Sequence, residues 1–325
     1  GNEFRLSELK KIGKQAVIIG VLQAVITTIC VDIVLVVMHF LMPDTVTIPM
    51  AITLGAIAAA TAPAATLLVI KQYKAKGPVT DILLPVVALD DAVGLVIFAA
   101  SFGAAEAIIN NSTNIINLIF DPIIEIFISL LLGTIVAVIL TYLERYFNSN
   151  SNRLILIIAS IILAVAIAKV SFKFRSFNGS FSPLLVCMML GTVFCNICPL
   201  SDDLMNRADK WSKPIIVLFF VLSGAELDLS VFQNPMVIII GVVYIIARSF
   251  GKYFGARISA SIAGSINVVK KYLGITLLPQ AGVALGMSSI VAERLSENGT
   301  LIRNVTLFSV LIYELFGPTL TKTAL

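Results

Sequence analysis

Long apolar stretches separated by short polar segments run through the whole sequence. Ten of them are long enough to cross a bilayer core of ~30 Å as helices, some with tilt. These predicted spans are 13–41, 46–71, 79–105, 118–143, 153–171, 180–197, 213–228, 235–262, 272–292 and 302–323. The pattern therefore predicts an all-α polytopic membrane protein.

Composition and charge agree with this prediction and exclude other classes. Hydrophobic residues make up 58% of the 325 residues, and charged residues only 13%. The charged share is about half that of an average soluble domain. The net charge of +4 is small and scattered, so we expect no nucleic-acid partner. The chain begins at Gly1 rather than at methionine, which is typical of a fragment or a trimmed chain.

Basic residues gather in every second loop between the predicted spans. They lie before the first span and after the second, fourth, sixth and eighth spans: Arg5, Lys10, Lys11, Lys14, Lys71, Lys74, Lys76, Arg145, Arg153, Arg207, Lys210, Lys213, Lys270 and Lys271. By the positive-inside rule these loops, and with them both chain ends, are cytoplasmic. Four residues break the alternation, namely Lys173, Arg175, Arg294 and Arg303.

A short motif occurs twice, at an offset of 223 residues. Gly1-Asn2-Glu3-Phe4-Arg5-Leu6-Ser7 resembles Gly224-Ala225-Glu226-Leu227-Asp228-Leu229-Ser230. Each copy precedes a long span, a span interrupted by proline and a span that contains acid. The first copy starts in the cytoplasm and the second outside, so the sequence predicts an inverted repeat, as in many secondary transporters. It also implies that spans ought to precede Gly1.

Both repeats contain an interrupted span. The first interruption is at Ala60-Thr61-Ala62-Pro63-Ala64-Ala65-Thr66, where Pro63 cannot donate a backbone hydrogen bond and Thr61 and Thr66 offer hydroxyls. The second is Leu278-Pro279-Gln280-Ala281-Gly282, which contains Pro279 and Gln280. A single proline kink is common in membrane helices, but paired interruptions indicate a transport site.

Two adjacent acids, Asp90 and Asp91, lie about 17 Å into the third span, near the bilayer midplane. Ionisable residues at that depth are costly and usually mark an ion or proton path. Adjacent helix residues point ~100° apart, so the two carboxylates face different surroundings. We expect one to pair with Lys252 in the eighth span while the other faces water. The alternative is that Lys252 extends along the helix to the interface.

Other residues carry weaker signals. Gly251 and Gly255 form a small-xxx-small face that permits close helix contact. Glu314 in the last span is either a further functional acid or an interfacial residue. Cys195-x-x-Cys198 and the single histidine, His39, fit structural roles, with a metal or redox site and a pH sensor as the respective alternatives.

Together these segments resemble the monovalent cation:proton antiporter superfamily, on its bacterial sodium–proton antiporter branch (Kef-like and NapA-like). The resemblance is carried by Thr61–Thr66, Lys74–Pro78, Ala88–Gly94, Gly251-Lys252 and Leu277–Ala284, and it covers essentially the whole chain. It implies an inverted-repeat antiporter fold with two broken helices that cross at the midplane. It also implies that Asp91 binds cation and protons in turn, that Asp90 pairs with Lys252, and that Thr61 lies at the crossing beside them.

The resemblance further implies a division into domains. Residues 1–105 are expected to form a core transport domain from the first repeat, without its N-terminal spans. A linker helix over 106–150 and a dimerisation part over 151–230 follow, and 231–325 completes the core with the second repeat. The implied assembly is a homodimer.

We therefore predict a transporter rather than an enzyme, which exchanges Na⁺ or Li⁺ for H⁺ by an elevator-type mechanism. The Asp-Asp pair implies electrogenic exchange. The expected location is the inner (plasma) membrane of a bacterium, with no cofactor and no metal beyond the transported ion. The alternatives are K⁺/H⁺ exchange of the Kef type, a channel or ion sensor, and an organic-anion symporter.

Overall fold

The computed structural model describes residues 13–62, 66, 69–70, 72–109, 115–170, 172–174, 177–179, 181–225 and 235–325. Its helices are α2 (Lys14–Leu41), α3 (Ile48–Ala58), α5 (Pro78–Ile109), α6 (Ile115–Glu144), α7 (Asn150–Ala168), α8 (Pro183–Ile197), α9 (Ser201–Ala225), α10 (Pro235–Ile262), α11 (Asn267–Thr276), α12 (Gly282–Arg294) and α13 (Ser296–Ala324). A short antiparallel hairpin pairs β1 (Phe172–Phe174) with β2 (Phe177–Gly179). The hairpin contains Lys173, one of the exceptions to the charge alternation.

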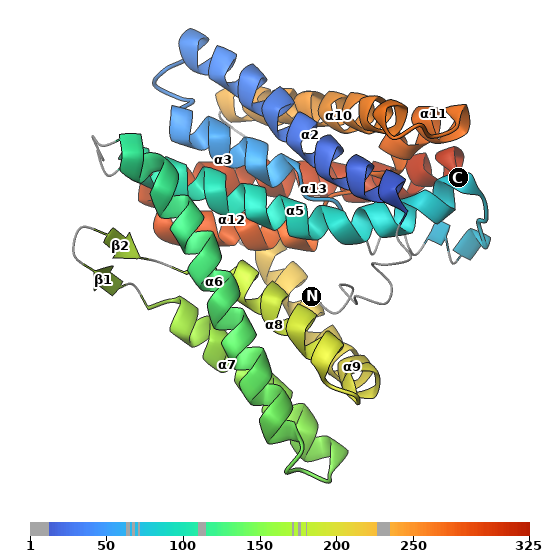
Figure 1. Ribbon diagram of the computed structural model, residues 1–325. Coiled ribbons are helices and arrows are strands. Elements are labelled where there is room, and N and C mark those ends of the chain that lie inside the picture. The colour runs from blue at the N-terminus through green and yellow to red at the C-terminus, as the bar shows by residue number, and fades with distance from the viewer. Residues whose placement is uncertain are drawn as a thin grey trace. The chain divides into compact units, whose positions relative to one another are not determined.

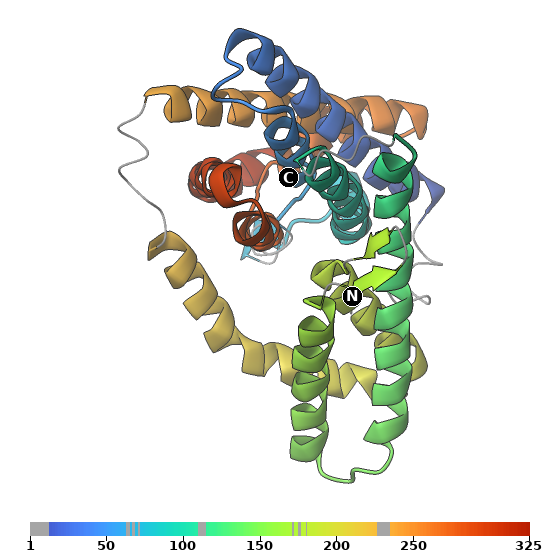
Figure 2. The same cartoon turned by 90° about the vertical axis from the view of Figure 1, so that its left-hand side faces the viewer.

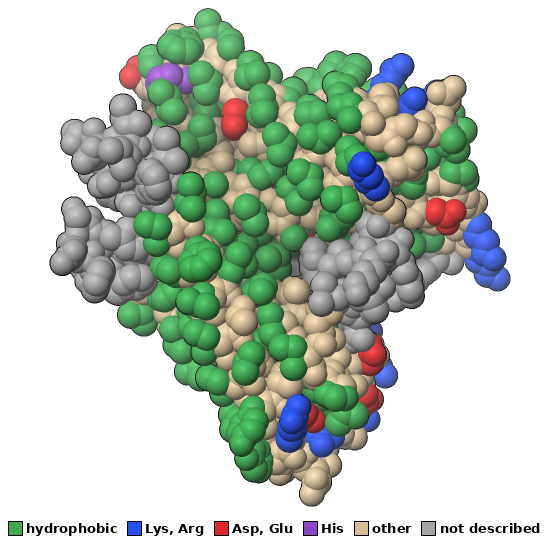
Figure 3. Space-filling model, in the orientation of Figure 1, with side chains coloured by type: hydrophobic (Ala, Val, Ile, Leu, Met, Phe, Trp, Pro, Cys, Tyr) green, Lys and Arg blue, Asp and Glu red, His purple; other side chains and the backbone are tan. Residues whose placement is uncertain are grey.

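The helices confirm the prediction of a multi-pass membrane protein. Six of those described are long and apolar enough to cross a membrane, and α3 and α8 are shorter apolar helices. Apolar side chains cover much of the face that Figure 3 shows, which is the exposure expected where lipid is the solvent. The predicted span 235–262 coincides with α10.

The seventh predicted span shows the largest error at its start. The seventh span was expected over 213–228, but α9 begins at Ser201, with Asp202 and Asp203 in its first turn. Acids near a helix N-terminus interact favourably with the helix dipole, so the helix begins there. Arg207, Lys210 and Lys213 consequently lie within a helix rather than in a loop.

Proline and threonine define several helix starts. Pro78 and Pro235 are the first residues of α5 and α10, and Pro183 opens α8. Proline suits this position because its missing N–H would have no partner inside the helix. In α3 the Thr47 hydroxyl accepts from the Met50 N–H at 3.3 Å and caps the helix.

The chain divides into two compact units, which are described separately. The larger comprises residues 12–111 and 222–325 and contains α2, α3, α5 and α10 to α13. Here α2 packs against α3, α5 and α10, while α13 packs against α10, α11 and α12 (Figures 1 and 2). Each half of this unit has a long helix, an interrupted segment and a second long helix, in the order that the repeat predicted. Most of the two motif copies lies outside the described residues.

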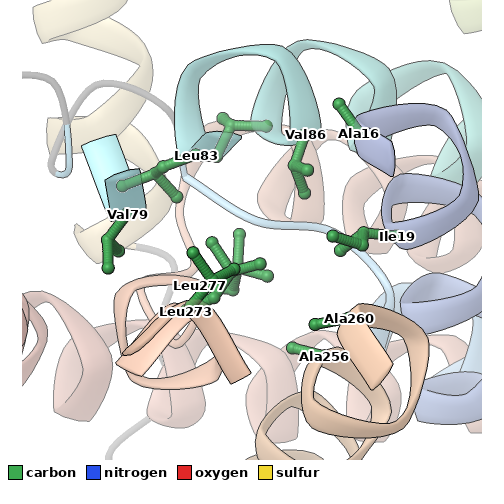
Figure 4. Packing of buried hydrophobic residues seen from close by; sticks show 11 residues of the cluster. Ala16, Ile19, Val79, Leu83, Val86, Ala256, Ala260, Leu273 and Leu277 are labelled. Atoms are coloured by element: carbon green, nitrogen blue, oxygen red, sulfur yellow. The ribbon is translucent and has the colours of Figure 1, made fainter. Parts of the chain in front are cut away.

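An apolar cluster joins four helices of the larger unit (Figure 4). Its members come from the start of α2, the start of α5, the end of α10 and α11: Ala16, Ile19, Val79, Leu83, Val86, Val87, Ala256, Ala260, Val269, Leu273 and Leu277. These residues lie toward the chain segments assigned to the cytoplasmic side. Beyond them, toward the middle of the same helices, the interior becomes polar.

The smaller unit comprises the described residues between 115 and 221. Within it α6 packs closely against α8, and α7 contacts both. Gly133 makes the α6–α8 contact possible, since a Cβ there would lie 2.5 Å from the Val186 carbonyl oxygen. Glu144 at the end of α6 pairs with Arg153 at 2.9 Å.

Candidate functional site

The two interrupted segments lie side by side in the middle of the larger unit. The Ala62 N–H donates to the Pro279 carbonyl at 2.8 Å, which joins the first interruption directly to the second. The Thr61 and Thr66 hydroxyls donate to the carbonyls of Leu277 and Thr276, at 3.4 Å and 3.2 Å. The paired interruptions identified in the sequence are thus in contact.

Helix ends at these interruptions leave backbone carbonyls without intrahelical partners, and Arg248 of α10 satisfies three of them. Its guanidinium donates to Ala58 O at 3.0 Å, Ala60 O at 2.7 Å and Leu278 O at 2.7 Å. Arg248 is fully buried, and its charge lies over the Tyr313 ring. A cation here also matches the negative ends of the α3 and α11 dipoles.

One helical turn further along α10, Lys252 lies within a shell of four oxygens. Its ammonium is 2.5 Å from Ala59 O and 2.8 Å from Thr61 Oγ1. Gln23 Oε1 lies at 3.1 Å and Asp90 Oδ2 at 3.0 Å. Lys252 and Asp90 are both 0% exposed, so they form a fully buried ion pair. We call these five residues the Lys252 cluster.

Gln23 connects the two charged members of the Lys252 cluster. Its amide nitrogen donates to Asp90 Oδ1, while its amide oxygen accepts from Lys252. Both oxygens of the Asp90 carboxylate therefore have donors, as a buried charge requires. Close approach of α2 and α10 makes this possible, because Gly255 lies against the Gln23 backbone and Gly251 against Thr27.

Gln280, in the second interruption, also connects several helices through its side-chain amide. Its side-chain nitrogen donates to Ile57 O at 3.0 Å and lies 3.2 Å from the Tyr244 hydroxyl, while its side-chain oxygen accepts from Ser309 at 3.1 Å. Gln280 is fully buried and connects α3, α10 and α13. It therefore holds the first interruption against the second repeat.

Asp91 differs from Asp90 in its surroundings. Both lie in α5, but Asp90 is buried whereas Asp91 is partly exposed. This difference follows from the ~100° rotation between neighbouring helix residues. Asp91 is therefore the more exposed acid of the pair, although one of its oxygens, Oδ1, is itself buried.

The remaining predicted site residues lie elsewhere. Pro63 is outside the described residues. Glu314 is exposed on α13, whereas its neighbour Tyr313 donates to Ile245 O at 2.8 Å. None of the four cysteines forms a disulfide, and the described residues contain no group of three or more His, Cys, Asp or Glu that could hold a metal ion.

Two members of the site were not singled out from the sequence. Neither Gln23 nor Arg248 was among the predicted site residues. The available signal was the same for both residues, namely a strongly polar side chain within an apolar stretch. Arg248 and Lys252 are also four residues apart, which places both on one face of α10.

The site combines carboxylate, carbonyl, hydroxyl and amide oxygens around a buried ammonium. Oxygen atoms of these types are the ligands that hard cations prefer. An ammonium and a small monovalent cation carry the same charge, so the same oxygens can hold either. The arrangement can therefore exchange one positive charge for another.

Comparison with known proteins places this arrangement in context. Residues 1–325 match the family described as "Sodium/hydrogen exchanger, transmembrane". The structure of MjNhaP1, a sodium proton antiporter from Methanocaldococcus jannaschii, at pH 8 aligns with a TM-score of 0.73 and 19% identity, over 99% of this chain and 81% of that one. A three-dimensional electron-microscopy map of MjNhaP1 gives a TM-score of 0.64 and 17% identity, over 99% and 80%. Among curated proteins, no sequence matches this chain.

These likenesses confirm the predicted fold class, an inverted repeat with two broken helices that cross. The helix order and the contact between the two interruptions agree with it.

Proposed function

Because this chain belongs to the sodium/hydrogen exchanger family, whose members exchange cations for protons, we propose that it exchanges Na⁺ or Li⁺ for H⁺ and that Asp91 binds cation and proton in turn. The observation that carries this proposal is the oxygen shell around Lys252 beside two adjacent acids. The shell already holds one monovalent positive charge in the interior of the larger unit.

Competition for the acids explains how transport of the two ions is coupled. A bound cation favours ionised carboxylates, and protons that neutralise them release the cation. Asp91 is the more exposed acid, while Asp90 shares its charge with Lys252. Entry of a cation beside Asp90 would displace the Lys252 ammonium or favour loss of its proton.

We propose that exchange is electrogenic, with two protons exchanged for one cation. Two acids and one lysine provide enough titrating groups for this stoichiometry. A net charge moved per cycle couples transport to the membrane potential, at ~2.3 kcal/mol per charge per 100 mV. Equal rates at zero and at imposed potential would contradict this part of the proposal.

We propose alternating access of the elevator type in a homodimer. The division into two compact units supports this, because the Lys252 cluster and both interruptions lie in the larger unit. That unit could move as one body while the smaller unit stays with its partner. Under this proposal, residues 151–230, the predicted dimerisation part, form the contact between the two protomers.

The test is proton release from proteoliposomes after addition of Na⁺, Li⁺ or K⁺. We expect Na⁺ and Li⁺ to release protons from vesicles with the wild-type protein. Asp91→Asn should reduce release to the level of protein-free vesicles. Asp81→Asn is the matched control, because Asp81 is in the same helix but exposed in its first turn.

Other outcomes would change the conclusion. A response to K⁺ alone would replace the proposed substrate with K⁺. A response that Asp91→Asn leaves intact would contradict the role of Asp91, and no response to any cation would overturn the proposed activity.

A further inference from the structure

A third carboxyl lies within the larger unit and takes no part in the Lys252 cluster. Asp32 is the only acid in α2, between Val31 and Ile33. One of its oxygens, Oδ1, is buried and has no hydrogen-bond partner among the described residues. A buried carboxylate oxygen without a donor is rare and costly, so it calls for a functional reason.

This carboxyl lies directly against the backbone of α3. A Cβ added to Gly55 would be 1.8 Å from Asp32 Oδ1 and 3.1 Å from the Thr28 carbonyl oxygen. Only glycine leaves room for the carboxyl at this position. By contrast, a Cβ at Gly286 in α12 would meet nothing within 4 Å.

The charged groups on the helices packed against α2 do not neutralise Asp32. In α2 itself, Lys14 and His39 lie near the helix ends, and α3 contains no ionisable residue. The groups on α5 and α10 are Asp81, Asp90, Asp91, Glu106, Arg248, Lys252 and Arg257. Among the cations, Lys252 pairs with Asp90, and Arg248 donates to backbone carbonyls. No described cation is bonded to Asp32.

Asp32 as a whole is partly exposed, but its Oδ1 is buried against the backbone of α3, where an ionised oxygen without a donor is strongly disfavoured. The observed packing therefore fits the neutral, proton-bearing form of Asp32. A single carboxyl with no other acid bonded to it does not make a metal site, but it can hold a proton. When it loses that proton, water must reach Oδ1 or the carboxyl must move away from Gly55.

A movement of the Asp32 carboxyl away from Gly55 would also change contacts in the Lys252 cluster. Gly55 lies about one helical turn before Ala58, the last residue of α3, and before Ala59, which caps the helix. The Ala58 carbonyl accepts from Arg248 at 3.0 Å, and the Ala59 carbonyl accepts from Lys252 at 2.5 Å. A shift of α3 at Gly55 would change both contacts.

We propose that Asp32 is a second proton-binding carboxyl, outside the cation site, whose protonation holds α3 in place and so sets the rate of exchange at the Lys252 cluster. This inference rests on the proposed exchange activity. The ligand is the proton alone. Ionisation of Asp32 at alkaline pH slows exchange.

The first test measures the proton on Asp32 without measuring transport. Dicyclohexylcarbodiimide is apolar and modifies protonated carboxyls within membranes. The purified protein is treated with it from mildly acidic to alkaline pH, and the adducts are located by mass spectrometry of peptides. We expect an adduct on Asp32 that declines as pH rises. Gly55→Ala, whose Cβ displaces the carboxyl, should reduce it, whereas Gly286→Ala should not.

The second test measures the pH dependence of Na⁺-driven proton release in proteoliposomes. Asp32→Asn keeps the side chain neutral at every pH, so we expect the variant to lose the decline in rate at alkaline pH. Asp81→Asn should keep the wild-type profile. Elution from a sizing column checks that each variant is folded.

The outcomes separate this inference from the proposed function. Absence of the Asp32 adduct at every pH overturns the inference, as does the same alkaline decline in wild type and Asp32→Asn. If the wild-type protein shows no exchange, the proposed function fails, and the effect of Asp32 on rate fails with it. The adduct still decides whether Asp32 holds a proton.

Discussion

At the scale of single residues, the ion pair between Lys252 and Asp90 is the most demanding interaction in the protein. Both side chains are fully buried, so each depends on the other to offset the loss of water. Lys252→Met should lower the free energy of unfolding by about 3 to 5 kcal/mol, because it leaves an uncompensated carboxylate. The double variant Lys252→Met, Asp90→Leu should recover much of this loss. Denaturant titration in detergent micelles measures the free energy of unfolding of the single and the double variant. An equal loss of stability in the two variants would contradict the pairing.

Arg248 offers a second prediction, since a lysine cannot reproduce its planar array of donors. Arg248→Lys keeps the charge, but one compact ammonium cannot reach three carbonyls that are each bonded to a different guanidinium nitrogen. The expected loss of stability is about 1 to 3 kcal/mol for each buried carbonyl left without a donor. Arg257→Lys is the matched control, because Arg257 is in the same helix and exposed. Equal unfolding temperatures for the two variants would show that Arg248 is not needed as a guanidinium.

At the scale of elements, the contact between α2 and α10 depends on small residues. Gly251→Ala would put a Cβ 3.0 Å from the Thr27 Cα, so the two helices must separate slightly. We expect this overpacking to cost about 1 to 3 kcal/mol and to weaken the bonds of Gln23. Gly286→Ala, where nothing lies within 4 Å, should leave stability unchanged or raise it by up to ~1 kcal/mol. Thermal unfolding of the two variants, followed in parallel, tests the contrast.

Elements were largely predictable from the apolar pattern, and contacts between them were not. The bounds of α10, both interruptions and the position of Asp90 within a long helix follow from runs of apolar residues and from proline. The start of α9 was missed because its first turns are polar, so the apolar pattern begins only later. The β1–β2 hairpin was missed because its strands are only three residues long.

Contacts at the site depend on residues far apart in the sequence. Pairing of Lys252 with Asp90 was predicted because few charges occur in apolar spans, and few partners were available. The bonds of Arg248 to Ala58 and Ala60 could not be predicted, since carbonyl oxygens are the same at every residue. Contact of Asp32 with Gly55 likewise depends on how two helices are rotated against each other, which no single span reveals. The proposed domain boundaries and the roles of Asp91 and Thr61 remain predictions.

At the scale of the whole molecule, the charge alternation predicts which loops face the cytoplasm. In a variant without the four native cysteines, Asp44→Cys should react with a membrane-impermeant maleimide added outside intact cells. Lys271→Cys should react only after the membrane is opened. Both positions are exposed, so a difference in reaction reports sidedness rather than burial. If Lys271→Cys reacts with the maleimide added outside, the predicted orientation is wrong and this loop faces the exterior.

The carbonyls held by Arg248 have a consequence for how the chain is made. Helix α3 has 11 residues, so at 1.5 Å per residue it covers about half of the ~30 Å bilayer core. The hydrogen-bond donor to the carbonyls at its C-terminal end is Arg248, which is synthesised about 190 residues later in α10. Until α10 leaves the ribosome and enters the membrane, those carbonyls need water or an assisting protein. We therefore expect a nascent chain halted before Pro235 to be a substrate for membrane chaperones and proteases, because α10 completes the first repeat as well as the second.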